Sequence, residues 1–485
     1  MNNNIIITLD QGSSSSRALA IDGTGRVVAQ AARTLQTIRP AEGLAEIDAS
    51  SLLADQLAVL REVCAQITNR RVAALSVATQ RSTIVFWDRI TGQPLGPALS
   101  WQDGRAASLM PQITISQEIV HQLTGLYKTP FYSAAKITWA LQHIPAVSEA
   151  AQSGRLCIGP VASYLIWHLT GGKVFACDPT LAQRMLLFNM NTLTWDDQLL
   201  SAFSVPKNCL PQIKKTADDY GEWIYQDTSI PIRVCVGDQQ AALVALQVKK
   251  GESCINYGTG AFFMHNTGSK LHLLAGLLTS VAATESSMGA CEYLLEGPVN
   301  ACGTLLDWLQ KIGFDFSVKE LDDLCQQAKA PIDFLPALGG LGAPYWKFDS
   351  SVVMAGFFPQ TTRADVAAGA VRSLAYLLAD IVFYVAKSGV KSTNIKVTGG
   401  LSQNLSLLTA QADILQTPLI PCAETEGTAL GAAMLAAKEL TWDISSWQTN
   451  RLLPAITPRI DATTAQKCYQ HWQAFLQWSL QHPKA

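Results

Sequence analysis

Two glycine-containing hairpins, separated by about half the chain, constrain the fold of this sequence more than any other feature. In the first, residues 9–17 read Leu-Asp-Gln-Gly-Ser-Ser-Ser-Ser-Arg between two apolar, strand-like runs. In the second, Asn-Tyr-Gly-Thr-Gly at 256–260 lies between the strand-like runs 253–255 and 261–264. Glycine permits a sharp turn and lets backbone N–H groups approach a phosphate closely. The pair predicts two phosphate-binding hairpins that face each other across a nucleotide cleft.

Length, charge and cysteine usage narrow the class of protein. A chain of 485 residues exceeds what one hydrophobic core usually supports, so two or more domains are expected. The net charge of −2 and the lack of Lys/Arg-rich runs argue against nucleic acid as a partner. Neither a signal peptide nor an uninterrupted stretch of 18 apolar residues is recognisable, so no membrane segment is expected. The 11 scattered cysteines, none in CxxC spacing, are typical of free thiols in a reducing cytoplasm.

Strand-like and helix-like segments alternate through both halves of the chain, which is typical of mixed α/β domains. Because the glycine hairpin recurs, we expect two related lobes, residues 1–247 and 248–485. Strands are expected at 27–29, 72–78, 232–236 and 395–398, and helices at 51–68 (behind a serine cap), 160–170, 241–246 and 428–437.

Two carboxylates stand beside glycines at the ends of expected strands, Asp10 and Asp238. Phosphoryl transfer needs a phosphate cradle, a metal ion near a carboxylate, and a base for the attacking hydroxyl. Asp10, within the first cradle, suits a magnesium ion. Asp238, at a strand-to-helix junction next to Gln239, suits a substrate hydroxyl. A lone aspartate at a strand end more often caps a turn, but the two hairpins together favour phosphoryl transfer.

Several short segments, weak singly, together form a specific pattern along nearly the whole chain. In this order and spacing they resemble the FGGY carbohydrate kinases of the actin-like ATPase superfamily, and among them the glycerol kinases. The segments are Leu9–Gly12, Thr79–Arg81, Trp101–Asp103, Ser133–Trp139, Met185–Asn189, Gly237–Ala242, Tyr257–Gly260, Leu341–Trp346, Gly399–Gly400 with Asn404, and Thr428–Ala433. The resemblance implies an α/β fold of two actin-like (ribonuclease H-like) lobes, with ATP and Mg²⁺ as cofactors. It also implies transfer of the γ-phosphate to a primary hydroxyl of a small polyol or sugar.

The resemblance assigns roles to individual residues. Asp238 matches the catalytic base and Asp10 the carboxylate beside magnesium, so both are candidate metal ligands. Positions around the nucleotide are matched by Gly12, Ser13, Ser14, Arg17, Thr259, Gly260, Gly303, Gly400 and Asn404. Positions of the polyol pocket are matched by Arg81, Ser82, Trp101, Phe131, Asp238, Gln239 and Phe262. Arginine and aspartate suit hydroxyls and aromatic rings suit C–H faces, although Trp101 or Phe262 alone would more often be a core residue.

Two of these positions depart from the glycerol kinase pattern. Ser82 stands where those enzymes carry a glutamate that binds a glycerol hydroxyl, and Phe131 stands in place of a tyrosine. Losing a hydrogen-bonding group from a polar pocket changes discrimination strongly. These departures predict that glycerol is a poor or secondary substrate, and that a longer polyol or an open-chain ketose is preferred.

Three alternative functions stay open at the level of the residues. A ketose kinase of the xylulose or ribulose type is one alternative, since a ketose could use the space that Ser82 vacates. An actin-like chaperone or filament ATPase is disfavoured because residues 79–82 and 237–240 indicate a small-molecule pocket. A non-catalytic sugar sensor is disfavoured because Asp10, Arg17 and Asp238 are all present. The expected partners are a small substrate and further copies of the chain, as a dimer or tetramer.

Overall fold

The computed structural model describes residues 4–284, 291–314, 317, 319–423, 426–447 and 452–482. The chain divides into two compact units. The first unit contains Met1–Gln247, Ser280–Glu292 and Glu426–Asn450, and the second contains Val248–Thr279, Tyr293–Thr425 and Arg451–Ala485. The first unit takes in two segments, Ser280–Glu292 and Glu426–Asn450, that follow residue 247 in the chain.

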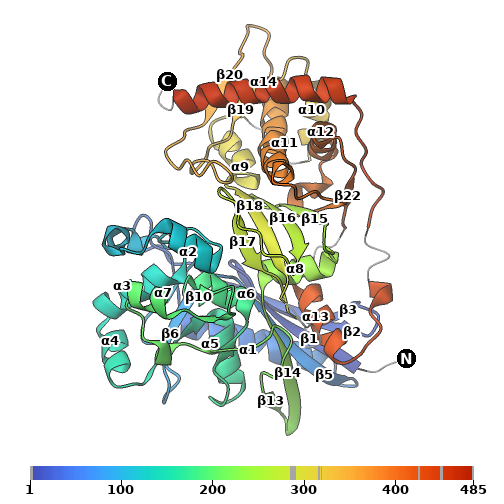
Figure 1. Cartoon of the computed structure of the whole chain (residues 1–485). Coiled ribbons are helices and arrows are strands. Elements are labelled where there is room, and N and C mark those ends of the chain that lie inside the picture. The colour runs from blue at the N-terminus through green and yellow to red at the C-terminus, as the bar shows by residue number, and fades with distance from the viewer. Residues whose placement is uncertain are drawn as a thin grey trace. The chain divides into compact units, whose positions relative to one another are not determined.

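The centre of the first unit is a six-stranded sheet in the order β13-β14-β5-β1-β2-β3 (Figure 1). The first glycine hairpin forms as predicted, because β1 and β2 pair antiparallel on either side of its turn. Strands β5 and β14 extend the sheet in parallel with β1. The strands are β1 (Asn4–Gln11), β2 (Ser15–Asp22), β3 (Val27–Thr34), β5 (Arg71–Thr79), β13 (Glu222–Tyr225) and β14 (Thr228–Gly237).

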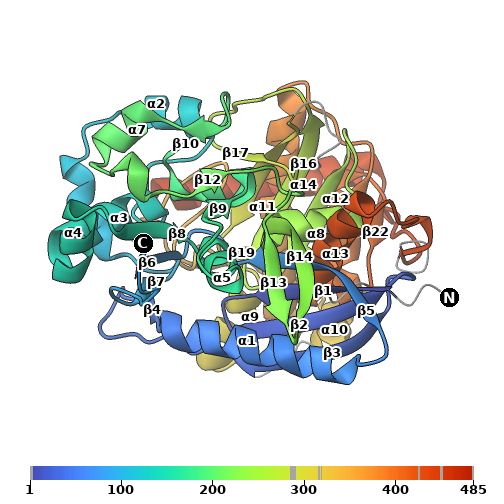
Figure 2. The same cartoon turned by 90° about the horizontal axis from the view of Figure 1, so that it is seen from below.

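Helix α1 (Ala49–Gln66) covers β2 and β3, as Figure 2 shows. The expected serine cap is wrong. Asp48 caps the helix instead, accepting hydrogen bonds from the backbone N–H groups of Ser50 and Ser51. A carboxylate beside the first turn also interacts favourably with the helix dipole, so aspartate is the better cap where both residue types are present.

Helix α13 (Gly427–Glu439) belongs to the first unit although it lies near the C-terminal end of the chain. It packs against β1, β5, β14 and α8 (Asp238–Leu246), and Figure 1 shows it beside α8. The two helices touch through their backbones, since a Cβ atom added to Gly431 would lie 1.7 Å from the carbonyl oxygen of Ala241. The alanine-rich sequence of α13 permits this approach.

Shorter elements complete the first unit. A second sheet of four strands has the order β4-β7-β6-β8. The helix that follows its last strand, α5, packs into the hydrophobic core of the main sheet. These elements are β4 (Glu46–Ile47), β6 (Ile84–Asp88), β7 (Ala98–Leu99), η1 (Arg105–Gln112), α2 (Gln117–Thr124), α3 (Ser133–His143), α4 (Pro145–Gln152), β8 (Leu156–Pro160), α5 (Val161–Leu169), β9 (Ala176–Cys177), α6 (Pro179–Ala182), η2 (Gln183–Met185), β10 (Phe188–Asn189), β11 (Thr194–Trp195), α7 (Asp197–Ala202), η3 (Lys207–Cys209), β12 (Gln212–Ile213) and η5 (Ser445–Trp447).

The second unit repeats the design with a sheet in the order β17-β18-β16-β15-β21-β22. The second glycine hairpin also forms as predicted, with β15 and β16 antiparallel, while β21 runs parallel to β15. The elements are β15 (Ser253–Tyr257), β16 (Ala261–Gly268), β17 (Leu278–Val281), β18 (Tyr293–Val299), α9 (Gly303–Lys311), α10 (Leu321–Gln327), β19 (Asp333–Leu335), β20 (Val353–Ala355), α11 (Arg363–Lys387), β21 (Ile395–Thr398), η4 (Gly400–Gln403), α12 (Leu405–Leu415), β22 (Leu419–Pro421) and α14 (Ala462–Gln481).

Helix α11 is, within the described ranges, the one helix long and apolar enough to cross a membrane. Its most apolar window is 78% buried inside the protein. Its residues Val371, Leu374 and Leu378 belong to the hydrophobic core of the second unit. The apolar character of α11 is therefore explained by core packing.

Candidate active site

The turn between β1 and β2 combines exposed hydroxyls with a buried ion pair. The N–H of Gly12 donates to the carbonyl of Ser15 at 3.0 Å, which closes the turn and leaves Ser13 and Ser14 exposed at its tip. Behind the turn, the Arg17 guanidinium contacts the Asp10 carboxylate. The exposed hydroxyls of Ser13 and Ser14, with the Arg17 guanidinium behind them, suit an anion.

Arg17 bridges two carboxylates from distant parts of the chain. Its Nη1 lies 2.6 Å from Oε2 of Glu426, and its Nη2 contacts Asp10, whose side chain is only 5% exposed. Burial raises the pKa of Asp10, and the positive charge of Arg17 opposes that rise. A phosphate arriving at this hairpin would therefore meet an arginine already held in place by Glu426.

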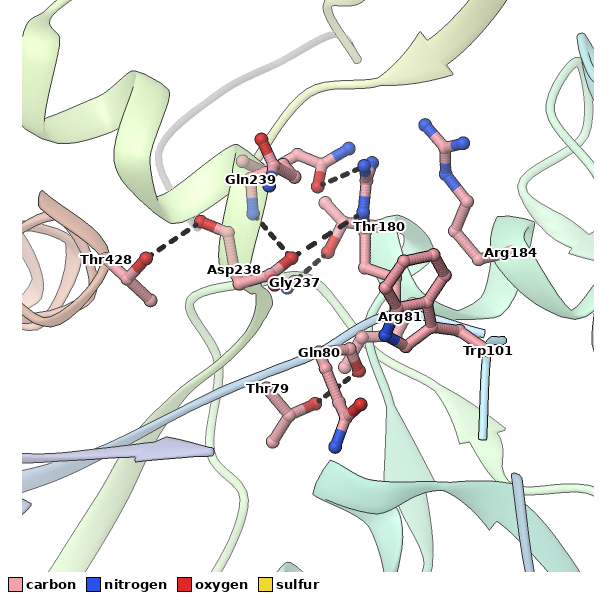
Figure 3. Close-up of polar contacts among 12 residues, drawn as sticks. Thr79, Gln80, Arg81, Trp101, Thr180, Arg184, Gly237, Asp238, Gln239 and Thr428 are labelled. Carbon is pink, nitrogen blue, oxygen red and sulfur yellow. Dashed lines mark hydrogen bonds and ion pairs between the residues drawn. The ribbon is translucent and has the colours of Figure 1, made fainter. Parts of the chain in front are cut away.

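Asp238 is the first residue of α8, at the end of β14 (Figure 3). Its Oδ1 accepts a hydrogen bond from the backbone N–H of Gln239 at 2.8 Å and lies 3.7 Å from Nε of Arg81. Burial raises the pKa of Asp238 and the charge of Asp10 adds to the rise, while Arg81 lowers it. A carboxylate with a raised pKa is a stronger base, and 26% of this side chain stays accessible.

Arg81 and Trp101 extend the site away from Asp238. Nη1 of Arg81 donates to Oε1 of Gln240 at 3.4 Å, and its side chain is only 12% exposed. Nε1 of Trp101 donates to Oγ of Ser13 at 2.9 Å, although the ring is 41% exposed. Oε1 of Gln239 is buried and has no hydrogen-bond partner in the described part of the chain. The first hairpin, Arg81 and Trp101 therefore form one continuous polar site.

A buried lysine fixes the two turns that carry this pocket. The Nζ of Lys136, in α3, donates to the carbonyl of Ser82 at 2.9 Å and to the carbonyl of Ser100 at 2.8 Å. Ser82 has a φ of +64°, a conformation that an ordinary side chain rarely adopts without such support. Burial lowers the pKa of Lys136 to about 7, and nearby Asp103 opposes that shift. The neighbours of these two serines, Arg81 and Trp101, are held in place through this amine.

Phe131 lies two residues before Ser133, whose hydroxyl donates to the carbonyl of Ser82 at 3.2 Å. Phe131 itself is 49% exposed in the segment before α3, with its ring beside Gly104. Phe262, in β16, lies in the second unit, where its backbone pairs with Asn256 and Pro298. The assignment of both aromatics to the substrate pocket stays a prediction.

The second glycine hairpin is closely packed against the start of α9. The N–H of Gly258 donates to the carbonyl of Gly260 at 3.0 Å, and the N–H of Gly303 donates to the carbonyl of Gly258 at 2.9 Å. A Cβ added to Gly260 would lie 2.8 Å from the carbonyl oxygen of Val299, so a side chain is excluded there. Thr259, Gly260 and Gly303 therefore meet in one tight turn.

Gly400 and Asn404 lie on the segment that follows β21. Its first residue, Gly399, has a φ of +97°, and a Cβ there would lie 2.5 Å from the carbonyl oxygen of Tyr257. This close approach sets the segment against the second hairpin. Oδ1 of Asn404 caps α12 by accepting from the N–H of Leu407 at 2.8 Å, while its buried Nδ2 has no partner in the ranges described. An unsatisfied buried donor of this kind suits a ligand acceptor.

Few side chains among the described residues are placed to coordinate a magnesium ion. The described residues contain no group of three or more His, Cys, Asp or Glu side chains arranged to hold a metal ion. Magnesium in phosphoryl-transfer sites is usually held by one or two carboxylates together with substrate phosphates and water. Asp10 and Asp238 fit that requirement, since they lie near enough for one charge to raise the pKa of the other.

Sequence reasoning missed three residues that support other residues of the candidate site. Glu426 holds Arg17, Thr180 accepts a hydrogen bond from the N–H of Gly237 at 2.8 Å, and Arg184 lowers the pKa of Asp238 by its charge. The pair Asp178–Pro179 has the sequence pattern of a helix start, which predicts a helix cap but does not indicate which residues this cap contacts in the folded chain. Glu426 lies two residues before the segment Thr428–Ala433, and this proximity is the one sequence signal that points to it.

Comparisons with known proteins cover both units. Residues 5–245 match the N-terminal domain of the FGGY family of carbohydrate kinases, and residues 254–440 match its C-terminal domain. Glycerol kinase of Thermus brockianus is 38% identical over 439 residues, 88% of each chain. Glycerol kinase of Shewanella pealeana (strain ATCC 700345 / ANG-SQ1) is 35% identical over 491 residues, 98% of this chain and 99% of the relative. The crystal structure of Plasmodium falciparum glycerol kinase with ADP has a TM-score of 0.93 at 27% identity and covers 98% of both chains. The expected α/β class with two actin-like lobes is confirmed.

Proposed function

This chain belongs to the FGGY family of carbohydrate kinases, and we propose that it transfers the γ-phosphate of ATP to a terminal primary hydroxyl of a small polyol. The family and the near-full-length similarity to glycerol kinases make it an ATP-dependent carbohydrate kinase. The observation that carries the proposed mechanism is Asp238, a carboxylate of raised pKa beside Arg81 and Gln239.

In this mechanism Asp238 accepts the proton of the attacking hydroxyl. Arg81 holds a neighbouring substrate hydroxyl by a charge-assisted hydrogen bond, and the free Oε1 of Gln239 accepts from another. The raised pKa suits Asp238 to this task, since a base works best when its pKa approaches the working pH. Trp101 covers the C–H face of the substrate.

Each unit carries glycine turns that are candidate nucleotide-binding segments. In the first unit, Gly12, Ser13, Ser14 and Arg17 bind the γ-phosphate. In the second, β15, β18 and β21 run in the same direction, so the turns that follow them lie at one edge of the sheet. These turns carry Thr259, Gly260, Gly303, Gly400 and Asn404, which we assign to the remainder of ATP. The unpaired Nδ2 of Asn404 supports that assignment.

Asp10 and Asp238 are the residues that would hold Mg²⁺ with the phosphates. The ion, when bound, neutralises the charge that develops on the transferred phosphoryl group. Arg17 keeps the Asp10 carboxylate oriented through their ion pair.

We expect Asp10→Asn to weaken nucleotide binding in the presence of Mg²⁺, because it removes a negative charge beside the ion. The loss should be roughly 10- to 100-fold, as for other hydrogen-bonded charges worth about 1.5–3 kcal/mol. Isothermal titration with ATP, with and without Mg²⁺, measures it. Asp22→Asn, at the last residue of β2, is the control and should bind normally. If Asp10→Asn changed only the affinity for the polyol, Asp10 would belong to the substrate pocket instead.

The acceptor is the least constrained part of the proposal. Ser82 has a shorter side chain than the glutamate of glycerol kinases, which leaves room beside Arg81. Lys136 holds the Ser82 backbone in place, so the turn does not move to fill that room. We therefore propose an acceptor longer than glycerol, with glycerol a poor or secondary substrate. A screen of ADP release over glycerol, tetritols, pentitols, ketopentoses, ketohexoses and gluconate tests this. ADP release without any acceptor would instead indicate an ATPase, and ATP or polyol binding without turnover would indicate a sensor.

Ser82→Glu should improve the use of glycerol. The substitution adds a charged acceptor beside Arg81, worth roughly 1.5–3 kcal/mol, which is about 10- to 100-fold in kcat/KM. Ser82→Gln is the matched control, because it adds the same length without the charge and should improve glycerol use much less. The measurement is kcat/KM for glycerol and for the best acceptor of the screen. Wild-type turnover of glycerol above every longer polyol and ketose would overturn the substrate proposal.

A further inference from the structure

A fully buried aspartate lies beneath the strand-to-helix junction that carries Asp238. Asp178, at the start of α6, is 0% exposed, and its carboxylate accepts three hydrogen-bond donors. The hydroxyl of Thr180 lies 2.8 Å from both carboxylate oxygens, the hydroxyl of Thr216 lies 2.7 Å from Oδ2, and the N–H of Leu181 lies 3.1 Å from Oδ1. The carboxylate thus fixes the direction in which each hydroxyl points its hydrogen.

Thr180 connects this carboxylate to the junction. A threonine hydroxyl has one hydrogen, and here that hydrogen is directed at Asp178, so only its lone pairs can face another group. The N–H of Gly237 donates to them at 2.8 Å, as Figure 3 shows. Gly237 is the last residue of β14 and directly precedes Asp238.

One other side chain bonds the backbone of the junction, since Oγ1 of Thr428 donates to the carbonyl of Asp238 at 3.4 Å. Gly237 is the N-cap of α8, and no side chain caps this helix start. A Cβ added to Gly237 would lie 3.0 Å from Cγ and Cδ of Arg81 and from Oε1 of Gln240, so the backbone here passes directly against the substrate side of the site. A small movement of Gly237 therefore changes the distance between Asp238 and Arg81.

We propose that Thr180, oriented by Asp178, is a positioning residue that holds Asp238 at the correct place and angle for proton transfer. This inference rests on the proposed role of Asp238 as the base. Thr180 touches neither substrate nor nucleotide in this scheme and acts only through Gly237. Misplacement of a reacting group by about 1 Å can cost about 10²-fold in rate, so loss of the Thr180 contact should appear in kcat.

The chain offers a closely matched control in Thr216. Its side chain is also fully buried, its hydroxyl also donates to Asp178, and it also accepts one backbone N–H, that of Thr284 at 2.9 Å. Thr180→Val and Thr216→Val therefore each remove one donor from the same carboxylate and one acceptor from a backbone N–H. They differ in whether that N–H belongs to the residue before Asp238, and the Thr216 hydroxyl additionally lies 3.3 Å from the hydroxyl of Thr284.

We expect both valine variants to unfold at lower temperature by similar amounts, and only Thr180→Val to lose about 10- to 100-fold in kcat, with KM for ATP nearly unchanged. Thr180→Ser keeps the hydroxyl and should recover most of the lost turnover. Equal kcat values for Thr180→Val and Thr216→Val would overturn the proposal. If Thr180→Val does not fold, Thr180→Cys replaces it, since a thiol accepts only weakly, and wild-type kcat in that variant would overturn the proposal equally.

A double variant distinguishes a failure of this inference from a failure of the proposed function. Adding Thr180→Val to an Asp238→Asn background should cause no additional loss of kcat, because there is no base left to position. Normal turnover of Asp238→Asn alone would remove the assignment of the base. An inactive Asp238→Asn together with an unimpaired Thr180→Val would remove only the positioning role.

Discussion

Asp238→Asn should lower kcat by about 10²–10⁴-fold, the usual cost of removing one general base, while the affinity for ATP measured without Mg²⁺ stays nearly unchanged. Asparagine has almost the same shape, and its side-chain oxygen can still accept from the N–H of Gln239 as Oδ1 of Asp238 does at 2.8 Å. The local fold should therefore persist while the proton acceptor is lost. The measurement is steady-state ADP release with the best acceptor, together with ATP titration.

The pH dependence gives a second readout of the same group. Asp238 must be deprotonated to act as a base, so activity is lost as the pH falls through its pKa. Burial raises that pKa, so the acid limb of kcat/KM should lie above the ordinary range of an aspartate, and Arg81→Met should move it higher still, because Arg81 lowers the pKa. Asp219→Asn, an exposed carboxylate paired with Arg233, is the control and should leave rate and profile unchanged. A wild-type rate in Asp238→Asn would exclude the assignment.

Gly431→Ala should destabilise the protein more than alanine at any other described glycine of the first unit. The new Cβ would have to occupy a position 1.7 Å from the carbonyl oxygen of Ala241 and 3.0 Å from the N–H nitrogen of Ala245, both backbone atoms of α8. The two helices must separate, and overpacking of this kind costs about 3 kcal/mol or more when backbone has to move. That is a large share of the roughly 5–15 kcal/mol that stabilises a typical protein.

Gly427→Ala provides the comparison within the same helix. A Cβ there would have Ala242 Cβ at 3.8 Å as its nearest neighbour, which is ordinary contact. Because alanine is favoured over glycine in helices by about 1 kcal/mol, this variant should be neutral or slightly stabilised. Urea denaturation of both variants measures the difference. Equal midpoints for Gly431→Ala and the wild type would show that α8 and α13 do not touch at this glycine.

The reach of sequence reasoning is clearest at the hairpins. Both were predicted from glycines between strand-like runs, and both form, because turn chemistry and strand alternation act over a few residues. The position of Asp238 at a strand end was predicted in the same way. The helix was expected to begin at Ala241 but begins at Asp238 itself, since the strand runs directly into the helix with no intervening loop.

Local signals failed where two residue types compete for one role. A serine was expected to cap the first long helix, and Asp48 does so instead. Both residues can accept from the first N–H groups, and the choice depends on where the preceding strand β4 ends. The position of a helix end depends on several small free-energy contributions from capping and turn residues, and the pattern of apolar residues does not reveal them.

The sequence by itself determined the two glycine hairpins and the alternation of strands and helices, and it singled out Asp10, Arg17 and Asp238 as candidate groups of the site. Only the tertiary structure decided what supports them. It brings Glu426 to Arg17, the amine of Lys136 to two pocket turns, and Thr180 to the N–H before Asp238. The physical reason is that turns and periodicity are set by neighbours in the chain. Burial and the choice of hydrogen-bond partner, in contrast, depend on segments that are far apart in the chain, such as Arg17 and Glu426 at a separation of 409 residues, and that meet only when the sheets and helices pack.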